Sequence, residues 1–131
     1  MILGIGTDLV QIKRIEETLL KFGSQFENKI FTTAEQTKAA SLPANKRASY
    51  YAKRFAAKEA FAKALGSGIG MSAFFKEIEV QNDSKGAPFL ILHGNALQTL
   101  LKKADNKPYQ VHLSLSDEKA FATAFVVIER I

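Results

Sequence analysis

At 131 residues, with 47% hydrophobic and 24% charged residues, the chain has the size and composition of one globular domain, residues 1–131. It has no cysteine and only two histidines, which excludes disulfides, a cysteine nucleophile and a multi-histidine zinc site, so any metal must bind mainly oxygen ligands, as Mg²⁺ does. Without a signal-like N-terminus or a membrane-length apolar run we expect a cytoplasmic protein, and the net charge of +5 favours an anionic partner.

The first half of the chain predicts a strand followed by helices. Residues 2–7 form a short apolar run with two glycines, which is typical of a buried strand. Residues 10–22 repeat apolar positions at helical spacing. The segment 32–35 resembles a capping box, and Pro43 can open the next helix. Residues 46–65 are rich in alanine and contain no glycine or proline, so they predict one long helix.

The second half predicts mainly strands, with one more helix. In chain order we expect strands over 75–81 and 89–92 paired as a hairpin, a helix over 96–104, and strands over 110–116 and 121–128. The last run is almost wholly apolar, so both of its faces should be buried, which hints at an oligomer.

Two separated segments carry the residues that could do chemistry. Asp8 follows the first strand, while Glu59 and Lys63 lie one turn apart on the long helix. Each has a plain structural explanation, because Asp8 could cap a helix and Glu59 and Lys63 could form a surface ion pair. Taken together, two carboxylates and a lysine suit a Mg²⁺ site for a diphosphate. The glycine-rich stretch 66–70 is either a helix C-cap or a backbone that approaches phosphate closely.

Segments 4–10 and 54–70 together resemble the holo-[acyl-carrier-protein] synthases, the small bacterial class of 4′-phosphopantetheinyl transferases. The similarity continues through 78–80, the turn at 86–88 and the strands at 112–116 and 126–129, so it spans essentially the whole chain. The resemblance implies transfer of the phosphopantetheine arm of coenzyme A to a serine of apo acyl carrier protein. Adenosine 3′,5′-bisphosphate would leave, and the reaction would serve fatty acid biosynthesis. It also implies an α+β fold, with a small antiparallel sheet packed with one long helix and shorter helices, and a homotrimer with active sites between subunits.

The resemblance also assigns residues. It implies that Asp8 and Glu59 bind magnesium and, with Lys63 at the diphosphate, are catalytic. It implies that Arg14 contacts the acidic carrier protein, and Lys21, on the same helix face, could join it. The residues that would hold coenzyme A are Lys46, Arg47, Arg54, Lys63, Gly66, Ser67 and Gly68.

The chain departs from the family at two positions. Ala87 stands in the turn where many members have lysine, which removes a cation near the nucleotide, and Asp117 stands where many have histidine. Two other functions are alternatives. One is a small nucleic-acid-binding module, suggested by the positive charge, although the basic residues are spread along the chain and nucleic acid is not the expected partner. The other is a relative that binds coenzyme A without catalysis, against which the intact Asp8, Glu59 and Lys63 argue.

Overall fold

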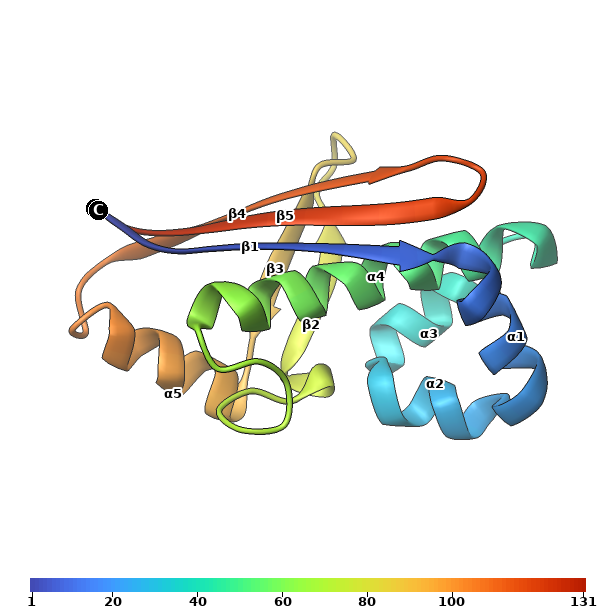
Figure 1. The fold of residues 1–131 in the computed structure, drawn as a ribbon, viewed down its shortest axis with the longest axis horizontal. Coiled ribbons are helices and arrows are strands. Elements are labelled where there is room, and N and C mark those ends of the chain that lie inside the picture. The colour runs from blue at the N-terminus through green and yellow to red at the C-terminus, as the bar shows by residue number, and fades with distance from the viewer.

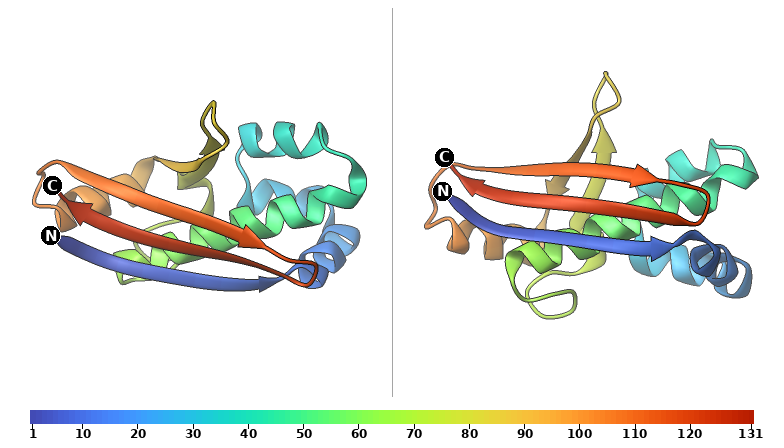
Figure 2. Two further views of the ribbon diagram at one scale, coloured as in Figure 1. Left: turned by 90° about the horizontal axis from the view of Figure 1, so that it is seen from above. Right: turned by 45° about the horizontal axis from the view of Figure 1, so that its top comes forward.

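The computed structural model describes all residues 1–131 and has an α+β architecture, as predicted (Figure 1). The larger sheet is antiparallel and three-stranded, in the order β1-β5-β4. Its strands are β1 (Ile2–Gln11), β4 (Tyr109–Asp117) and β5 (Phe121–Arg130). The smaller sheet is the predicted hairpin of β2 (Ile78–Asn82) and β3 (Pro88–Leu92). Both chain termini lie at the same end of the larger sheet (Figure 2).

One long helix runs along one face of the three-stranded sheet, and shorter helices gather at its two ends (Figures 1 and 2). The helices are α1 (Ile12–Phe22), α2 (Ser24–Ile30), α3 (Thr33–Ala40), α4 (Ala44–Leu65) and α5 (Gly94–Lys103), with a 3₁₀ turn at Phe75–Glu77. The long predicted helix is α4, and Pro43 directly precedes it. None of these helices combines the length and hydropathy needed to cross a membrane.

The first strand is longer than the sequence predicts, and this moves Asp8. β1 continues to Gln11 because it pairs with β5 over its whole length, so helix α1 begins only at Ile12. Asp8 therefore lies inside a strand, opposite Ala124, which rules out the alternative explanation that it caps a helix. Residues 75–77, predicted as strand, form the 3₁₀ turn instead.

Two glycines bring β1 unusually close to α4. A Cβ atom built on Gly6 would lie 1.8 Å from the carbonyl oxygen of Ala60, and one on Gly4 would lie 1.9 Å from that of Ala64. No side chain fits in that space, and the facing helix positions are themselves alanines. Side chains alternate along a strand, so Asp8 follows Gly4 and Gly6 on the face toward α4.

The apolar strand β5 is buried on only one of its faces. Its inward residues Ala122, Ala124, Val126 and Ile128 are fully buried, because α4 covers them. On the outward face Phe125 remains 47% exposed. The expectation that both faces are buried is wrong for the single chain, since all the helices lie on the other side of the sheet (Figure 1).

A buried ion pair ties α3 to α4. The Lys58 ammonium lies 2.8 Å from the Glu35 carboxylate, and both side chains are fully buried. Glu35 forms the predicted capping box with Thr32, and its second oxygen accepts a hydrogen bond from the backbone N–H of Val80. Both oxygens of this carboxylate accept hydrogen bonds, which offsets part of the cost of burying the pair.

Candidate active site

The close contact of β1 and α4 brings Asp8 and Lys63 together. The Lys63 Nζ atom lies 3.1 Å from Asp8 Oδ1 and also donates to the carbonyl oxygen of Thr7 at 3.0 Å. The lysine side chain remains 53% exposed, whereas that of Asp8 is 17% exposed. The ammonium group is thus held by β1 and is still accessible to a ligand.

Glu59 lies beside this pair without a hydrogen-bonding partner of its own. Lys63 is one helical turn away, yet it bonds to Asp8, so the local Glu59–Lys63 pair does not form. Partial burial raises the pKa of the Glu59 carboxyl group, the nearby Asp8 charge raises it further, and Lys63 opposes both. The two carboxylates therefore interact electrostatically, although 51 positions separate Asp8 from Glu59 in the sequence.

A cavity of about 490 Å³ opens over these groups. Asp8, Glu59 and Lys63 line it together with Arg14 from α1, and Phe26 and Phe55 contribute apolar walls. Arg14 thus lies at the same opening as the two acids. Lys21 does not line the cavity, and its ammonium lies over the ring of Phe22 at 5.2 Å.

The donor set of this cavity fits a hard divalent cation. Asp8 and Glu59 both offer carboxylate oxygens to this cavity. No third aspartate, glutamate or histidine joins them in a cluster. Mg²⁺ commonly binds through one or two carboxylates and fills its remaining positions with water and substrate phosphates. Two protein ligands therefore match a metal bound together with its substrate.

A second cavity, of about 450 Å³, has four cations among its ten lining residues and is called here the cationic cavity. Lys38 comes from α3, whereas Lys46, Lys53 and Arg54 come from α4, and Asp117 reaches in from the end of β4. Four cations facing one carboxylate make this opening attractive to an anion.

Arg54 is the most buried of these cations. It is 5% exposed, its guanidinium lies 4.0 Å from the ring centre of Tyr50, and it donates to the Asn82 side chain. Its Nε atom is buried and has no hydrogen-bond partner. Arg54 thus adds a fixed positive charge to the wall of this cavity.

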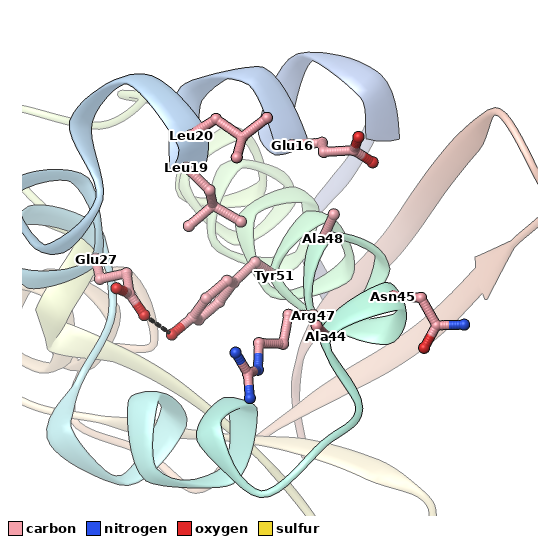
Figure 3. A pocket seen from close by; sticks show the side chains of 9 residues that line it. All are labelled: Glu16, Leu19, Leu20, Glu27, Ala44, Asn45, Arg47, Ala48 and Tyr51. Atoms are coloured by element: carbon pink, nitrogen blue, oxygen red, sulfur yellow. Dashed lines mark hydrogen bonds between the residues drawn. The ribbon is translucent and has the colours of Figure 1, made fainter.

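Arg47 turns away from its neighbour Lys46. Its Nε donates to the carbonyl oxygen of Ala39 at 3.1 Å, and its guanidinium lines a different cavity of about 590 Å³. Figure 3 shows this cavity, where the hydroxyl of Tyr51 donates to Glu27. The structure does not bring Arg47 and Lys46 to one site, because adjacent helix residues point about 100° apart.

The glycine-rich stretch begins as a helix C-cap. Gly66 has φ +92° and Gly68 has φ +72°, and a Cβ at either position would meet nothing within 4 Å. The Ser67 hydroxyl is hydrogen-bonded to that of Ser72. The stretch lies outside the cavity of Asp8 and Glu59, so the single chain does not join these two predicted parts of the site.

Sequence reasoning missed Lys38, Ser49 and Lys53 in the cationic cavity. A usable signal existed for the helix positions, because Lys46, Ser49 and Lys53 follow the i, i+3, i+7 spacing of one helix face. Lys38 lies on another helix and only the tertiary fold brings it near. Ala87 does not line the cavity that Asp117 enters.

Comparison with known proteins gives a consistent result. Residues 4–126 match the model of the 4′-phosphopantetheinyl transferase superfamily. The chain is 48% identical to the holo-[acyl-carrier-protein] synthase of Sphingopyxis alaskensis, with 100% of this chain and 98% of that protein covered. It is 46% identical to the enzyme of Brucella ovis, covering 98% of this chain and 96% of the relative.

Solved structures agree with the sequence comparison. The holo-[acyl-carrier-protein] synthase of Neisseria meningitidis is 44% identical, with a TM-score of 0.86 and coverage of 99% of this chain and 100% of that one. The synthase of Bacillus anthracis in complex with CoA (3′,5′-ADP) is 40% identical, with a TM-score of 0.83 and coverage of 100% and 99%.

These matches define first a class, the phosphopantetheinyl-transferring enzymes. Within that class, the chain belongs to the holo-[acyl-carrier-protein] synthase family, as its sequence motifs predict.

Proposed function

We propose that this enzyme transfers the 4′-phosphopantetheine group of coenzyme A to a serine of apo acyl carrier protein. The observation that carries the proposal is the cavity in which Asp8 from β1 and Glu59 and Lys63 from α4 meet. The Bacillus anthracis relative was solved with CoA (3′,5′-ADP) and the Helicobacter pylori relative with coenzyme A, which supports the substrate. We assign residues 1–131 to one such domain, serving fatty acid biosynthesis in the cytoplasm.

The reaction joins a serine oxygen to the phosphorus that carries the pantetheine arm. The serine Oγ–P bond forms, the P–O bond to the bridging oxygen breaks, and adenosine 3′,5′-bisphosphate leaves with that oxygen. The serine proton must pass to a base, and Asp8 and Glu59 are the carboxylates that line the cavity. Lys63 is exposed enough to pair with a departing phosphate, which would stabilise its growing negative charge.

We assign Asp8 and Glu59 as the ligands of Mg²⁺. When bound, Mg²⁺ would neutralise diphosphate charge and polarise its oxygens. Close backbone contact at Gly4 and Gly6 fixes β1 against α4. The carboxylates of Asp8 and Glu59 therefore need little reorganisation to bind one ion together.

The nucleotide part of coenzyme A would lie in the cationic cavity. Lys46 and Arg54 line it, and their positive charges would attract the nucleotide phosphates. Gly66, Ser67 and Gly68 would give their open backbone to the diphosphate, next to Lys63. Arg47 lines a different cavity, so we give it no role in this one.

The carrier protein would dock over α1. Arg14 lines the cavity of Asp8 and Glu59, so an acidic helix bound to it would present its serine at the diphosphate. Lys21 lies two turns further along α1 and would extend the same contact.

We also propose a homotrimer, with each active site completed by a neighbouring subunit. Its support is the outer face of the larger sheet, where Ile5 is 60%, Leu9 65% and Phe125 47% exposed. These residues lie on neighbouring strands β1 and β5, so they form one apolar surface that a second copy could cover.

The test is mass spectrometry of apo acyl carrier protein after incubation with the enzyme, coenzyme A and Mg²⁺. We expect the carrier to gain the mass of one phosphopantetheine. Binding of coenzyme A without a mass gain would favour a non-catalytic binder. A salt-dependent shift of random oligonucleotides, with no binding of coenzyme A, would favour a nucleic-acid-binding module.

A further inference from the structure

Asp117 is the only carboxylate on the wall of the cationic cavity. The charged groups around it are Lys38, Lys46, Lys53 and Arg54. It is the last residue of the edge strand β4, whereas three of these cations belong to α4. An acid at this position lowers the positive potential that an entering anion meets.

Both oxygens of Asp117 are bound to α4. Its Oδ1 lies 3.4 Å from Lys53 Nζ, and its Oδ2 accepts a hydrogen bond from the Ser49 hydroxyl at 3.0 Å. Ser49 and Lys53 are one helical turn apart, so they hold the carboxylate between them. The side chains of Lys53 and Asp117 are 29% and 37% exposed, so a ligand can reach both.

We propose that Asp117 is a specificity-determining residue that acts as an internal counter-anion for this cavity. It occupies Lys53 and repels incoming phosphate, which limits affinity for highly charged nucleotides and favours release of the bisphosphate product. The inference rests on the proposed function, because it takes the nucleotide of coenzyme A as the ligand of this cavity.

We expect Asp117 to discriminate between nucleotides by their negative charge. A phosphate that displaces Asp117 from Lys53 must overcome one existing ion pair and one repulsion between like charges. Both costs grow with the negative charge of the ligand, so adenosine 3′,5′-bisphosphate should be affected more than AMP. Salt should reduce the difference, because the groups are partly exposed.

The experiment is isothermal titration calorimetry of the full-length protein with adenosine 3′,5′-bisphosphate and with AMP, at low and at high salt. Asp117→Asn keeps an oxygen for Ser49 and removes only the charge. We expect it to bind the bisphosphate about three- to tenfold tighter than the wild type, with a smaller gain for AMP and a smaller gain at high salt. Glu118→Gln removes the same charge at the neighbouring exposed residue, which does not line the cavity, and should bind the bisphosphate as the wild type does.

A structural tie between β4 and α4 would give the opposite pattern. In that case Asp117→Asn and Ser49→Ala would both lower the melting temperature, and nucleotide affinity would be unchanged or weaker, which overturns the proposal. Should Asp117→Asn fail to fold, Asp117→Ser serves in the same titration. If the wild type modifies acyl carrier protein but binds the bisphosphate as tightly as Asp117→Asn does, this inference alone falls. If the wild type neither transfers phosphopantetheine nor binds the nucleotide, the proposed function falls with it.

Discussion

Lys63 bonds across to Asp8 on β1, with Nζ 3.1 Å from Oδ1, and does not pair with Glu59 on its own helix. This choice leaves Glu59 as a carboxylate without a cation, close to a second carboxylate. That arrangement costs folding stability, because partial burial and the nearby Asp8 charge both disfavour the ionised Glu59 carboxylate. We interpret the cost as a consequence of a site built to hold a cation.

The first prediction follows from the raised pKa of Glu59. Because this pKa lies above its ordinary value of 4.5, the folded protein binds the proton more tightly than the unfolded chain. Folding stability must therefore fall as the pH rises from about 4.5 through the pKa of the folded state. We expect Glu59→Gln to unfold at a higher temperature than the wild type at neutral pH, measured by calorimetry with a metal chelator present.

The same variant should transfer phosphopantetheine slowly. Loss of this charge should lower the rate of phosphopantetheine transfer by on the order of 10²-fold or more. Below pH 4.5 the stability advantage should disappear, since both proteins then carry a neutral group at this position. A wild type as stable as Glu59→Gln at neutral pH, or near-normal turnover of the variant, would contradict the assignment.

The second prediction concerns the contact of β1 with α4. Gly6→Ala places a Cβ 1.8 Å from a backbone oxygen of α4, so the strand and the helix must separate. We expect a loss of about 3 kcal/mol or more in the free energy of unfolding, measured with denaturant. The fraction that folds should transfer slowly, because Asp8 moves away from Glu59.

Gly70→Ala is the matched control for that substitution. Gly70 has φ +98° but open space at its Cβ, so alanine there meets conformational strain without a clash. Its cost should be about 1 kcal/mol. Equal losses in the two variants would show that close packing at Gly6 is not the reason for glycine there.

The third prediction tests the docking surface on α1. Arg14→Glu reverses a charge at the cavity mouth, so the KM for acyl carrier protein should rise about tenfold or more while the KM for coenzyme A changes little. Lys13→Glu makes the same change in charge at an exposed neighbour outside the cavity, and its effect should be smaller. A rise only in the KM for coenzyme A would place the carrier protein elsewhere.

The fourth prediction concerns the outer face of the larger sheet. Phe125→Asp introduces a charge into the middle of the exposed apolar surface. In the proposed trimer it would be buried without a partner, so sedimentation should show a shift to monomer and transfer activity should fall. A wild type that sediments as a monomer, or a variant that remains trimeric, would contradict the proposed assembly.

Much of this architecture could be predicted from the sequence. Helix α4 follows from its length and alanine content, and the capping box at Thr32 and Glu35 formed as expected. Gly4, Gly6 and Asp8 alternate along the sequence and so lie on one face of a strand. That the glycines allow close contact with α4 can be seen only in the folded structure. The end of β1 could not be predicted, because pairing with β5 decides it and local propensity does not.

The charged residues of α4 were the hardest to place. This helix is buried on most of its sides, so it shows no single apolar stripe to separate inside from outside. Lys58 looks like a surface residue in the sequence, yet it is fully buried against Glu35 from a distant helix. Arg47 and Lys46 are neighbours in sequence but line different cavities. Such partners are set by tertiary contacts, which spacing within one helix does not reveal.

The measurement that tests the central claim most directly is calorimetric titration of Mg²⁺ into the enzyme with coenzyme A present. It compares the wild type with Asp8→Asn and Glu59→Gln, and uses Glu17→Gln, an exposed acid on α1, as the control. We predict that each of the two site variants weakens Mg²⁺ binding by on the order of tenfold or more, because each removes one charged oxygen ligand, while the control leaves it unchanged. Equal Mg²⁺ affinity in all four proteins would contradict a metal site shared by β1 and α4.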